Sequence, residues 1–304
     1  MRAGVGILMI AGATLAACGP AAALPAALQP DAQVGIAPQA RAVQPPPADL
    51  AKAESQPKIA EVKAAAYLLM DAGSGSVLIS NGGQQRRAPA SLTKIMTALI
   101  VLERSKLDRL VTADQASLDA LKDTESSTIG LQAGDRMTVK DLLYGLLLPS
   151  GNDAALVLAK AVAGSEKSFV ELMNKRAAEL DLTHTHFDNP HGLDSRNQYS
   201  TAYDLARLTR VAMNNATFRE IVATQRQPVT ISGDPYSSPN YNELLQLYPG
   251  ADGVKIGYTD LAGETMIGSA VRDGRRLLVV VLGSNRRAAD AMLLLDRGFG
   301  LRAF

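Results

Sequence analysis

The chain has 304 residues, of which 47% are apolar and 20% are charged, and its formal net charge is +1. This balance predicts a globular protein with a sizeable core and excludes a chain that is disordered throughout. With 31 basic and 30 acidic residues there is no excess of positive charge, so the composition predicts no nucleic-acid partner.

The N-terminal segment has the pattern of a secretory signal. Arg2 precedes an apolar run at residues 5–17, which is shorter than the roughly 20 residues needed to cross a bilayer. The run ends in Leu-Ala-Ala-Cys, which resembles a bacterial lipoprotein cleavage box. We expect residues 1–17 to be removed and Cys18, the only cysteine, to carry a lipid anchor. An ordinary signal peptide cleaved further along the chain is the alternative.

A linker and one folded domain are expected to follow. Up to about residue 60 the sequence is dominated by Ala, Pro and Gln without helical or strand periodicity, which predicts a linker at residues 18–60. As a flexible coil this linker would reach roughly 35 Å from the membrane. Residues 61–304 contain no second Pro- or Gly-rich break and no internal repeat, so we expect one domain there.

Strand patterns stand at both ends of this domain and helical patterns between them. Apolar runs at residues 66–70 and 77–80 flank a turn-forming cluster and predict a hairpin, and runs at 265–271 and 276–282 joined by Asp-Gly predict another. Helical periodicity covers residues 91–103, 139–148, 154–162, 168–180, 203–213 and 287–297. Capping boxes are expected at Ser168 with Glu171 and at Thr201 with Asp204. This order predicts an α+β fold, with an antiparallel sheet formed by both ends and a helical insertion.

The first motif with chemical content is Ser91-Leu92-Thr93-Lys94, at the start of an apolar helix. Residues three apart share a helix face, so the Lys94 amine can reach the Ser91 hydroxyl. Serine needs a base, and a lysine can serve only if its pKa falls from about 10.4 towards 7 or 8. A serine that begins a helix followed by a solvated lysine is the structural alternative.

Two further motifs follow along the chain. Ser150-Gly151-Asn152 stands between two helical stretches and would otherwise be a turn with a helix cap. Lys255-Ile256-Gly257 lies in a strand-like segment, where an exposed lysine on an edge strand is the alternative.

In this order the three motifs resemble the S-x-x-K, S-x-N and K-T-G signature of serine penicillin-binding proteins and β-lactamases. Residues 90–98, 147–155, 187–193 and 199–206 resemble low-molecular-mass D-alanyl-D-alanine carboxypeptidases (peptidase family S11) more closely. The resemblance implies a β-lactamase/DD-peptidase-like fold whose helical insertion carries S-x-N. It also implies an enzyme that removes the terminal D-Ala from peptidoglycan stem pentapeptides through an acyl-enzyme. β-Lactams would be covalent inhibitors, and neither a cofactor nor a metal would be needed.

The resemblance assigns a catalytic role to each matching residue. Ser91 would attack the carbonyl between the two D-alanines, and Lys94 would take its proton. Ser150 would relay a proton to the leaving amine, Asn152 would hold the substrate amide, and Lys255 would supply positive charge nearby.

The resemblance also implies that Gly257, Tyr258, Thr259 and Arg287 bind the substrate. The backbone N–H groups of Ser91 and Tyr258 would form the oxyanion hole, and Arg287 would face the terminal carboxylate. For Arg287, a solvated charge at a helix start is the alternative.

One position departs from the family pattern, because Ile256 replaces a threonine whose hydroxyl is thought to bind the terminal carboxylate. A hydrogen bond to a charged group is worth about 1.5–3 kcal/mol. Its loss would weaken recognition of the carboxylate by roughly 10- to 150-fold unless Arg287 or Thr259 compensates. An endopeptidase or a relative with altered specificity is therefore an alternative, as is a non-enzymatic wall-binding lipoprotein. The chain also ends without the C-terminal domain and anchor of many relatives, which the N-terminal lipid would replace.

Two rival enzyme classes have weaker sequence support. A zinc carboxypeptidase is suggested by the three histidines and two aspartates between residues 184 and 194, but these lack the helical H-E-x-x-H spacing. A class A β-lactamase would need a glutamate that activates the deacylating water, and no E-x-x-x-N sequence stands between Asn152 and Lys255.

Overall fold

The computed structural model describes residues 47–122, 124 and 126–301, which belong to one compact unit spanning residues 43–304. The predicted signal peptide, Cys18 and the first part of the linker lie outside the described residues.

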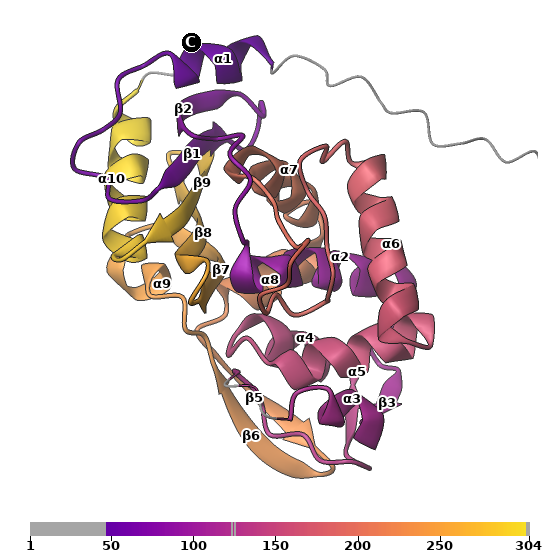
Figure 1. Cartoon of the computed structure of the whole chain (residues 1–304). Coiled ribbons are helices and arrows are strands. Elements are labelled where there is room, and N and C mark those ends of the chain that lie inside the picture. The colour runs from indigo at the N-terminus through magenta and orange to yellow at the C-terminus, as the bar shows by residue number, and fades with distance from the viewer. Residues whose placement is uncertain (1–46, 123, 125, 302–304) are drawn as a thin grey trace, which may run out of the picture. The chain divides into compact units, whose positions relative to one another are not determined.

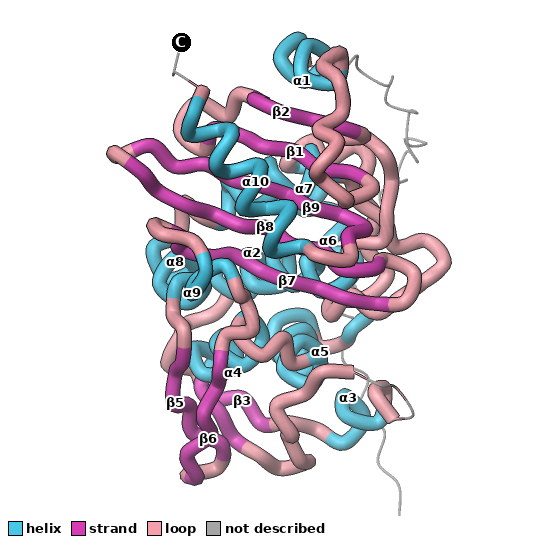
Figure 2. Tube along the Cα trace, turned by 90° about the vertical axis from the view of Figure 1, so that its left-hand side faces the viewer, coloured by secondary structure: helices cyan, strands magenta, loops and turns pink. Residues whose placement is uncertain are grey.

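A five-stranded antiparallel sheet in the order β2-β1-β9-β8-β7 forms the centre of the described chain (Figure 2). Its strands are β1 (Ala66–Asp71), β2 (Val77–Asn81), β7 (Ala251–Thr259), β8 (Gly263–Arg272) and β9 (Arg275–Ser284). β1 pairs with β9 as well as with β2, so the early and late parts of the chain join in one sheet. The predicted α+β fold, with a sheet built from both ends, is confirmed.

Helices cover both faces of this sheet. Helix α10 (Arg287–Gly300) lies across one face, as Figure 2 shows, and α2 (Lys94–Arg104) and α7 (Ala202–Ala212) lie behind the sheet in that view. Alternate residues of β9 point to opposite faces of the sheet and pack into different helical layers. Leu278, Val280 and Leu282 pack towards the helical insertion, whereas their neighbours in the strand pack towards α10. This explains why β9 reads as a continuous apolar run.

The insertion between β2 and β7 carries most of the helices and two small hairpins, β3–β4 and β5–β6. In Figure 1 the β5–β6 hairpin extends away from the central sheet. The remaining elements are α1 (Ala48–Glu54), η1 (Ala90–Thr93), β3 (Leu110–Thr112), α3 (Gln115–Asp119), β4 (Arg136–Thr138), α4 (Val139–Leu147), α5 (Asn152–Ala163), α6 (Glu166–Glu179), α8 (Ala216–Ala223), β5 (Arg226–Ile231), β6 (Asp234–Pro239) and α9 (Leu244–Leu247).

Helix α1 begins inside the segment predicted to be linker, so folded structure starts upstream of residue 61. Leu50 and Ala53 of this helix are buried. The Glu54 carboxylate accepts hydrogen bonds from the Ser80 hydroxyl and from the backbone N–H groups of Gly82 and Gly83, which fixes α1 against β2 and the turn after it. A short helix that is stabilised by such tertiary contacts has no periodicity long enough to detect in the sequence.

One predicted helix cap is confirmed and one is wrong. Thr201 begins α7 and its hydroxyl accepts from the backbone N–H of Asp204, as expected. For α6 the N-cap is Ser165, whose hydroxyl accepts from the Ser168 N–H, so the cap lies three residues earlier than predicted. Among the described residues, no helix has both the length and the apolar character needed to span a membrane.

Candidate active site

Ser91 lies in the 3₁₀ turn η1 that leads into α2, and strand β7 passes directly beside it. A Cβ atom added to Gly257 would lie 2.8 Å from the Ser91 backbone nitrogen and 2.6 Å from the Thr265 hydroxyl. On the other side, a Cβ added to Gly192 would lie only 2.0 Å from the carbonyl oxygen of Ala90. Two glycines therefore allow backbone segments from the late part of the sheet and from a loop to meet at the serine.

Lys94 is completely buried beneath Ser91 and has three polar neighbours. Its Nζ atom lies 2.9 Å from Ser91 Oγ, 2.6 Å from Asn152 Oδ1 and 2.6 Å from the carbonyl oxygen of His191. Asn152 Oδ1 and the His191 carbonyl oxygen can only accept, so each accepts one hydrogen bond from the amine. A neutral amine with these two bonds keeps its lone pair for the Ser91 hydroxyl, which is the arrangement that a general base requires.

Burial and positive charge both favour this neutral form. Burial lowers the pKa of Lys94 well below its usual value, and the nearby Lys255 lowers it further, while Asp153 acts in the opposite direction. Burial, assisted by Arg287, also lowers the pKa of Lys255 to about 7. Lys255 is 1% exposed, so it is not the exposed edge-strand lysine of the structural alternative.

The depressed pKa of Lys255 predicts that this lysine destabilises the fold. Between pH 7 and about 10.4 the unfolded chain binds a proton that the folded chain has lost, so the free energy of unfolding rises with pH in this interval. Lys255→Met should therefore raise the free energy of unfolding by about 1–4 kcal/mol at pH 6 and by less at pH 10. Urea denaturation at both pH values measures the difference. Exposed Lys167→Met is the control and should change little, and a Lys255→Met gain that grows with pH would contradict the account.

The S-x-N segment carries a strained serine at the start of α5. Ser150 has a φ of 69°, in the left-handed region that residues other than glycine rarely adopt. Its Oγ atom is buried without a hydrogen-bond partner among the described residues. The N-cap of α5 is Gly151 and has no side-chain cap, so Ser150 is not the capping serine of the structural alternative. A buried hydroxyl without a partner is available to a substrate.

Asp153, next to the S-x-N motif, holds a loop that forms one wall of the site. Its buried carboxylate accepts hydrogen bonds from the backbone N–H groups of Ile129, Gly130 and Leu131 at 3.0–3.1 Å. The carbonyl oxygen of Ser127 accepts from the Asn152 N–H at 2.8 Å. This loop and the start of α5 are thus fastened together.

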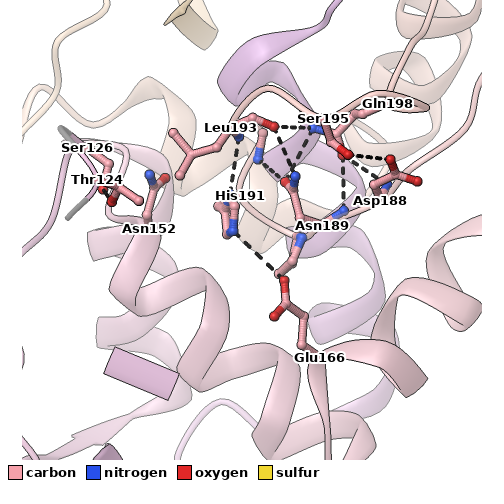
Figure 3. A network of polar contacts seen from close by, with 12 residues as sticks. Thr124, Ser126, Asn152, Glu166, Asp188, Asn189, His191, Leu193, Ser195 and Gln198 are labelled. Atoms are coloured by element: carbon pink, nitrogen blue, oxygen red, sulfur yellow. Dashed lines mark hydrogen bonds and ion pairs between the residues drawn. The ribbon is translucent and has the colours of Figure 1, made fainter. Parts of the chain in front are cut away.

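A second loop, which presents the His191 carbonyl to Lys94, is fixed by its own side chains (Figure 3). Asn189 accepts from the Gly192 N–H at 2.7 Å and donates to the Leu193 carbonyl at 3.0 Å. Gln198 accepts from the N–H groups of residues 188 and 189 and donates to the same Leu193 carbonyl. With its backbone held at several points, the loop keeps one Lys94 acceptor in place.

The His191 ring in this loop is electrically neutral. Burial and the nearby Lys94 lower the pKa of His191 to about 3, and its Nδ1 atom accepts from the Leu193 N–H at 3.2 Å. The ring proton is therefore on Nε2, which faces Glu166 at 3.9 Å (Figure 3). The ring thus adds no positive charge next to Lys94.

These segments enclose a cleft of about 350 Å³. Seven of the predicted site residues line this cleft: Ser91, Ser150, Asn152, Gly257, Tyr258, Thr259 and Arg287. Lys94 and Lys255 are buried. The other lining residues are Ser126, Ser127, Gly192, Leu193, Tyr241 and Ile256. Tyr241 and Tyr258 are exposed at its rim. Cys18 lies outside the described residues. The Lys255 amine donates to the carbonyl of Ile256 at 3.0 Å, and no hydrogen bond joins it to Ser150.

Neither group expected to compensate for Ile256 is free. The Thr259 hydroxyl donates to Asp194 at 2.7 Å and accepts from the Ala262 N–H. The Arg287 guanidinium lies 2.6 Å from the Glu243 carboxylate, and its side chain is only 15% exposed. Arg287 is therefore not the solvated helix-start charge of the structural alternative.

Sequence reasoning missed the two acidic residues that shape this site. Asp153 directly follows the S-x-N motif, and an acid in the first turn of an otherwise apolar helix was a signal that it is buried and paired. Glu243 precedes a short helix far from Arg287 in sequence, and no local pattern marks it.

The histidine-rich loop does not assemble a metal site. His186 contacts Asp188 at 3.3 Å, and His191 faces Glu166. Within the part of the chain that the structure describes, no three His, Cys, Asp or Glu side chains are grouped so that they could hold an ion. The zinc carboxypeptidase alternative therefore has no ligand set in these residues.

The same architecture and sequence occur in known proteins. Residues 50–286 match the profile of the peptidase S11 family, D-alanyl-D-alanine carboxypeptidase. The chain is 35% identical to the carboxypeptidase DacF of Bacillus subtilis and 38% identical to DacD of Escherichia coli, over 78% and 80% of its length. It spans 62% and 64% of those two relatives.

Relatives of similar length and known structure also match. A carboxypeptidase of Mycobacterium tuberculosis is 38% identical, with 84% of this chain and 88% of that protein covered. The crystal structure of a Streptomyces DD-transpeptidase superposes with a TM-score of 0.76 at 36% identity, with 81% of this chain and all of that chain covered. The chain therefore belongs to the peptidase S11 family of D-alanyl-D-alanine carboxypeptidases, and its fold is that of the DD-peptidases.

Proposed function

We propose that the chain is a serine-type D-alanyl-D-alanine carboxypeptidase that removes the terminal D-Ala from peptidoglycan stem pentapeptides and is acylated by penicillins. The observation that carries the proposal is the contact between Ser91 and a buried lysine whose other two hydrogen bonds are fixed by acceptors. Family membership and the cleft beside Ser91 support the same reaction.

The proposed reaction begins at Ser91. Its Oγ atom forms a bond to the carbonyl carbon between the two D-alanines while Lys94 Nζ takes the hydroxyl proton. The backbone N–H groups of Ser91 and Tyr258 stabilise the negative charge that develops on the carbonyl oxygen. The C–N bond then breaks, and the leaving amine receives a proton through Ser150.

The remaining residues hold the acyl donor during this step, and water completes the turnover. Asn152 binds the substrate amide, and Lys255 adds positive charge near the site. Water then attacks the ester carbon, which releases the shortened stem and restores the Ser91 hydroxyl. No cofactor takes part in this scheme.

The direct test is product analysis. Purified protein incubated with a stem pentapeptide should yield the tetrapeptide and free D-Ala, which mass spectrometry identifies. Release of a cross-linked partner from a dimeric stem, with no loss from the pentapeptide, would show an endopeptidase instead. No product from either substrate would favour the non-enzymatic alternative.

The substitution at Ile256 provides a prediction about substrate preference. Ile256 lines the cleft and cannot donate a hydrogen bond. Ile256→Thr should raise kcat/KM for a stem with a free terminal carboxylate by about tenfold or more, equivalent to roughly 1.4 kcal/mol. A substrate with an amidated terminus should gain little. Equal gains on both substrates would show that the substitution acts through packing.

The N-terminal sequence supports a proposal about location. We propose that Cys18 carries lipid and holds the domain on the outer side of a membrane, within reach of the cell wall. Cys18→Ser should release the protein from membranes and abolish labelling by a radioactive fatty acid. Unchanged partition into the membrane fraction would contradict lipid anchoring.

A further inference from the structure

At the end of the cleft lined by Arg287, a carboxylate of the protein itself, that of Glu243, contacts the guanidinium. Arg287 Nη2 lies 2.6 Å from Glu243 Oε1, and Arg287 Nε lies 3.4 Å from Glu243 Oε2. One edge of the guanidinium, formed by Nε and Nη2, therefore faces the Glu243 carboxylate as in a fork-like ion pair. Arg287 Nη1 has only a long contact, 3.4 Å, to the Gly257 carbonyl.

No other cationic group lines this end of the cleft among the described residues. Arg287 is the only basic residue in the lining. Lys255 is buried behind it and donates to the Ile256 carbonyl. The Thr259 hydroxyl proton is used by Asp194, and Ile256 has no donor. Arg287 is therefore the cationic side chain that an anionic group entering this end of the cleft would contact.

The pair with Glu243 makes this recognition unfavourable. Together Arg287 and Glu243 carry no net charge, and their side chains are only 15% and 38% exposed, so water screens them incompletely. An incoming carboxylate must displace Glu243 from the guanidinium or lie beside another negative charge. A neutral carboxamide meets no such repulsion, and discrimination between ligands is often built on a repulsive contact of this kind.

We propose that Glu243 is a specificity-determining residue that competes with the leaving-side carboxylate of the substrate for Arg287. The site consequently accepts acyl donors whose leaving-side carboxylate is amidated about as well as donors in which it is free. This inference rests on the proposed function, because it concerns the substrate of the same cleft.

The test uses Glu243→Gln and two N-acylated peptides that end in D-Ala-D-Ala, one with a free carboxylate and one with a carboxamide. Glutamine keeps an acceptor for Arg287 but removes the charge. The variant should increase kcat/KM for the peptide with a free carboxylate by about tenfold or more, mainly by lowering KM. It should change kcat/KM for the carboxamide peptide by less than about twofold. Glu243→Ala should shift the ratio in the same direction.

Glu264→Gln is the matched control. Glu264, in β8, accepts from the backbone N–H of Arg287 at 3.0 Å. Its variant therefore removes one negative charge beside the first residue of α10 but leaves the contact between Glu243 and the guanidinium intact. It should leave the ratio of the two substrates within about threefold of the parent.

Three results would overturn the inference. A loss of activity on the free carboxylate in Glu243→Gln would show that Glu243 orients Arg287 for the substrate. An unchanged ratio, or an equal shift in Glu264→Gln, would show that the contact has no specific role. If penicillin still forms its adduct at Ser91 in these cases, only the role of Glu243 fails. A parent protein that forms no adduct would overturn the proposed function together with it.

Discussion

Lys94→Met should reduce acylation of Ser91 by about 10³-fold, because general-base catalysis contributes roughly 10²–10⁴-fold and Lys94 is the base that contacts the serine among the described residues. Methionine preserves the unbranched shape of a side chain that is completely buried, so the fold should persist even though the buried acceptors on Asn152 and His191 lose their donor. The rate of adduct formation with a fluorescent penicillin measures the effect. Acylation at near the parental rate would remove Lys94 from the mechanism.

Lys94→Arg separates proton transfer from positive charge. A guanidinium keeps its proton at every accessible pH, so this variant places a cation beside Ser91 but provides no base. We expect it to acylate as slowly as Lys94→Met. Substantial activity in the arginine variant would mean that charge, and not proton transfer, is what Lys94 supplies.

Gly192→Ala should damage both the site and the fold. The added methyl carbon would lie 2.0 Å from the Ala90 carbonyl oxygen, and neither atom can move away without a shift of the backbone that fixes its position. Either the turn that carries Ser91 or the loop that presents the His191 carbonyl must shift. We expect acylation to fall by about 10²-fold or more, and the free energy of unfolding to fall by about 2–4 kcal/mol through clash and strain at positive φ.

Gly164→Ala is the control for backbone strain alone. Gly164 has a φ of 78°, and an added Cβ would meet no atom within 4 Å. This variant should lose about 1–2 kcal/mol of stability and acylate normally. If Gly192→Ala behaves like Gly164→Ala in both measurements, the close approach at Ser91 is not essential.

Patterns with a regular period allowed much of the fold to be predicted. The antiparallel pairing of β1 with β2 and of β8 with β9 was expected from short apolar runs around turn residues, and Asp273 and Gly274 both adopt the positive φ that such a turn requires. Helices α2, α4, α5, α7 and α10 were also expected close to their observed bounds. By contrast, α1 and the β5–β6 hairpin were missed, because their polar sequences show little periodicity.

The part of the candidate site that depends on short sequence motifs could be predicted. The spacing of Ser91 and Lys94 indicated their contact, which the structure shows at 2.9 Å. One of the two acceptors of Lys94 is a backbone carbonyl, that of His191, and a sequence carries no signal for which carbonyl will face inward. The ion pair between Glu243 and Arg287 joins residues 44 positions apart, so only the folded chain reveals it.

If Ser91 is the nucleophile, a labelled penicillin should modify this residue, and peptide mapping of the treated protein locates the label. We expect one adduct per chain, found by mass spectrometry on the peptide that contains Ser91 and absent from Ser91→Ala. An adduct on another residue, or one that persists in Ser91→Ala, would contradict this role of Ser91.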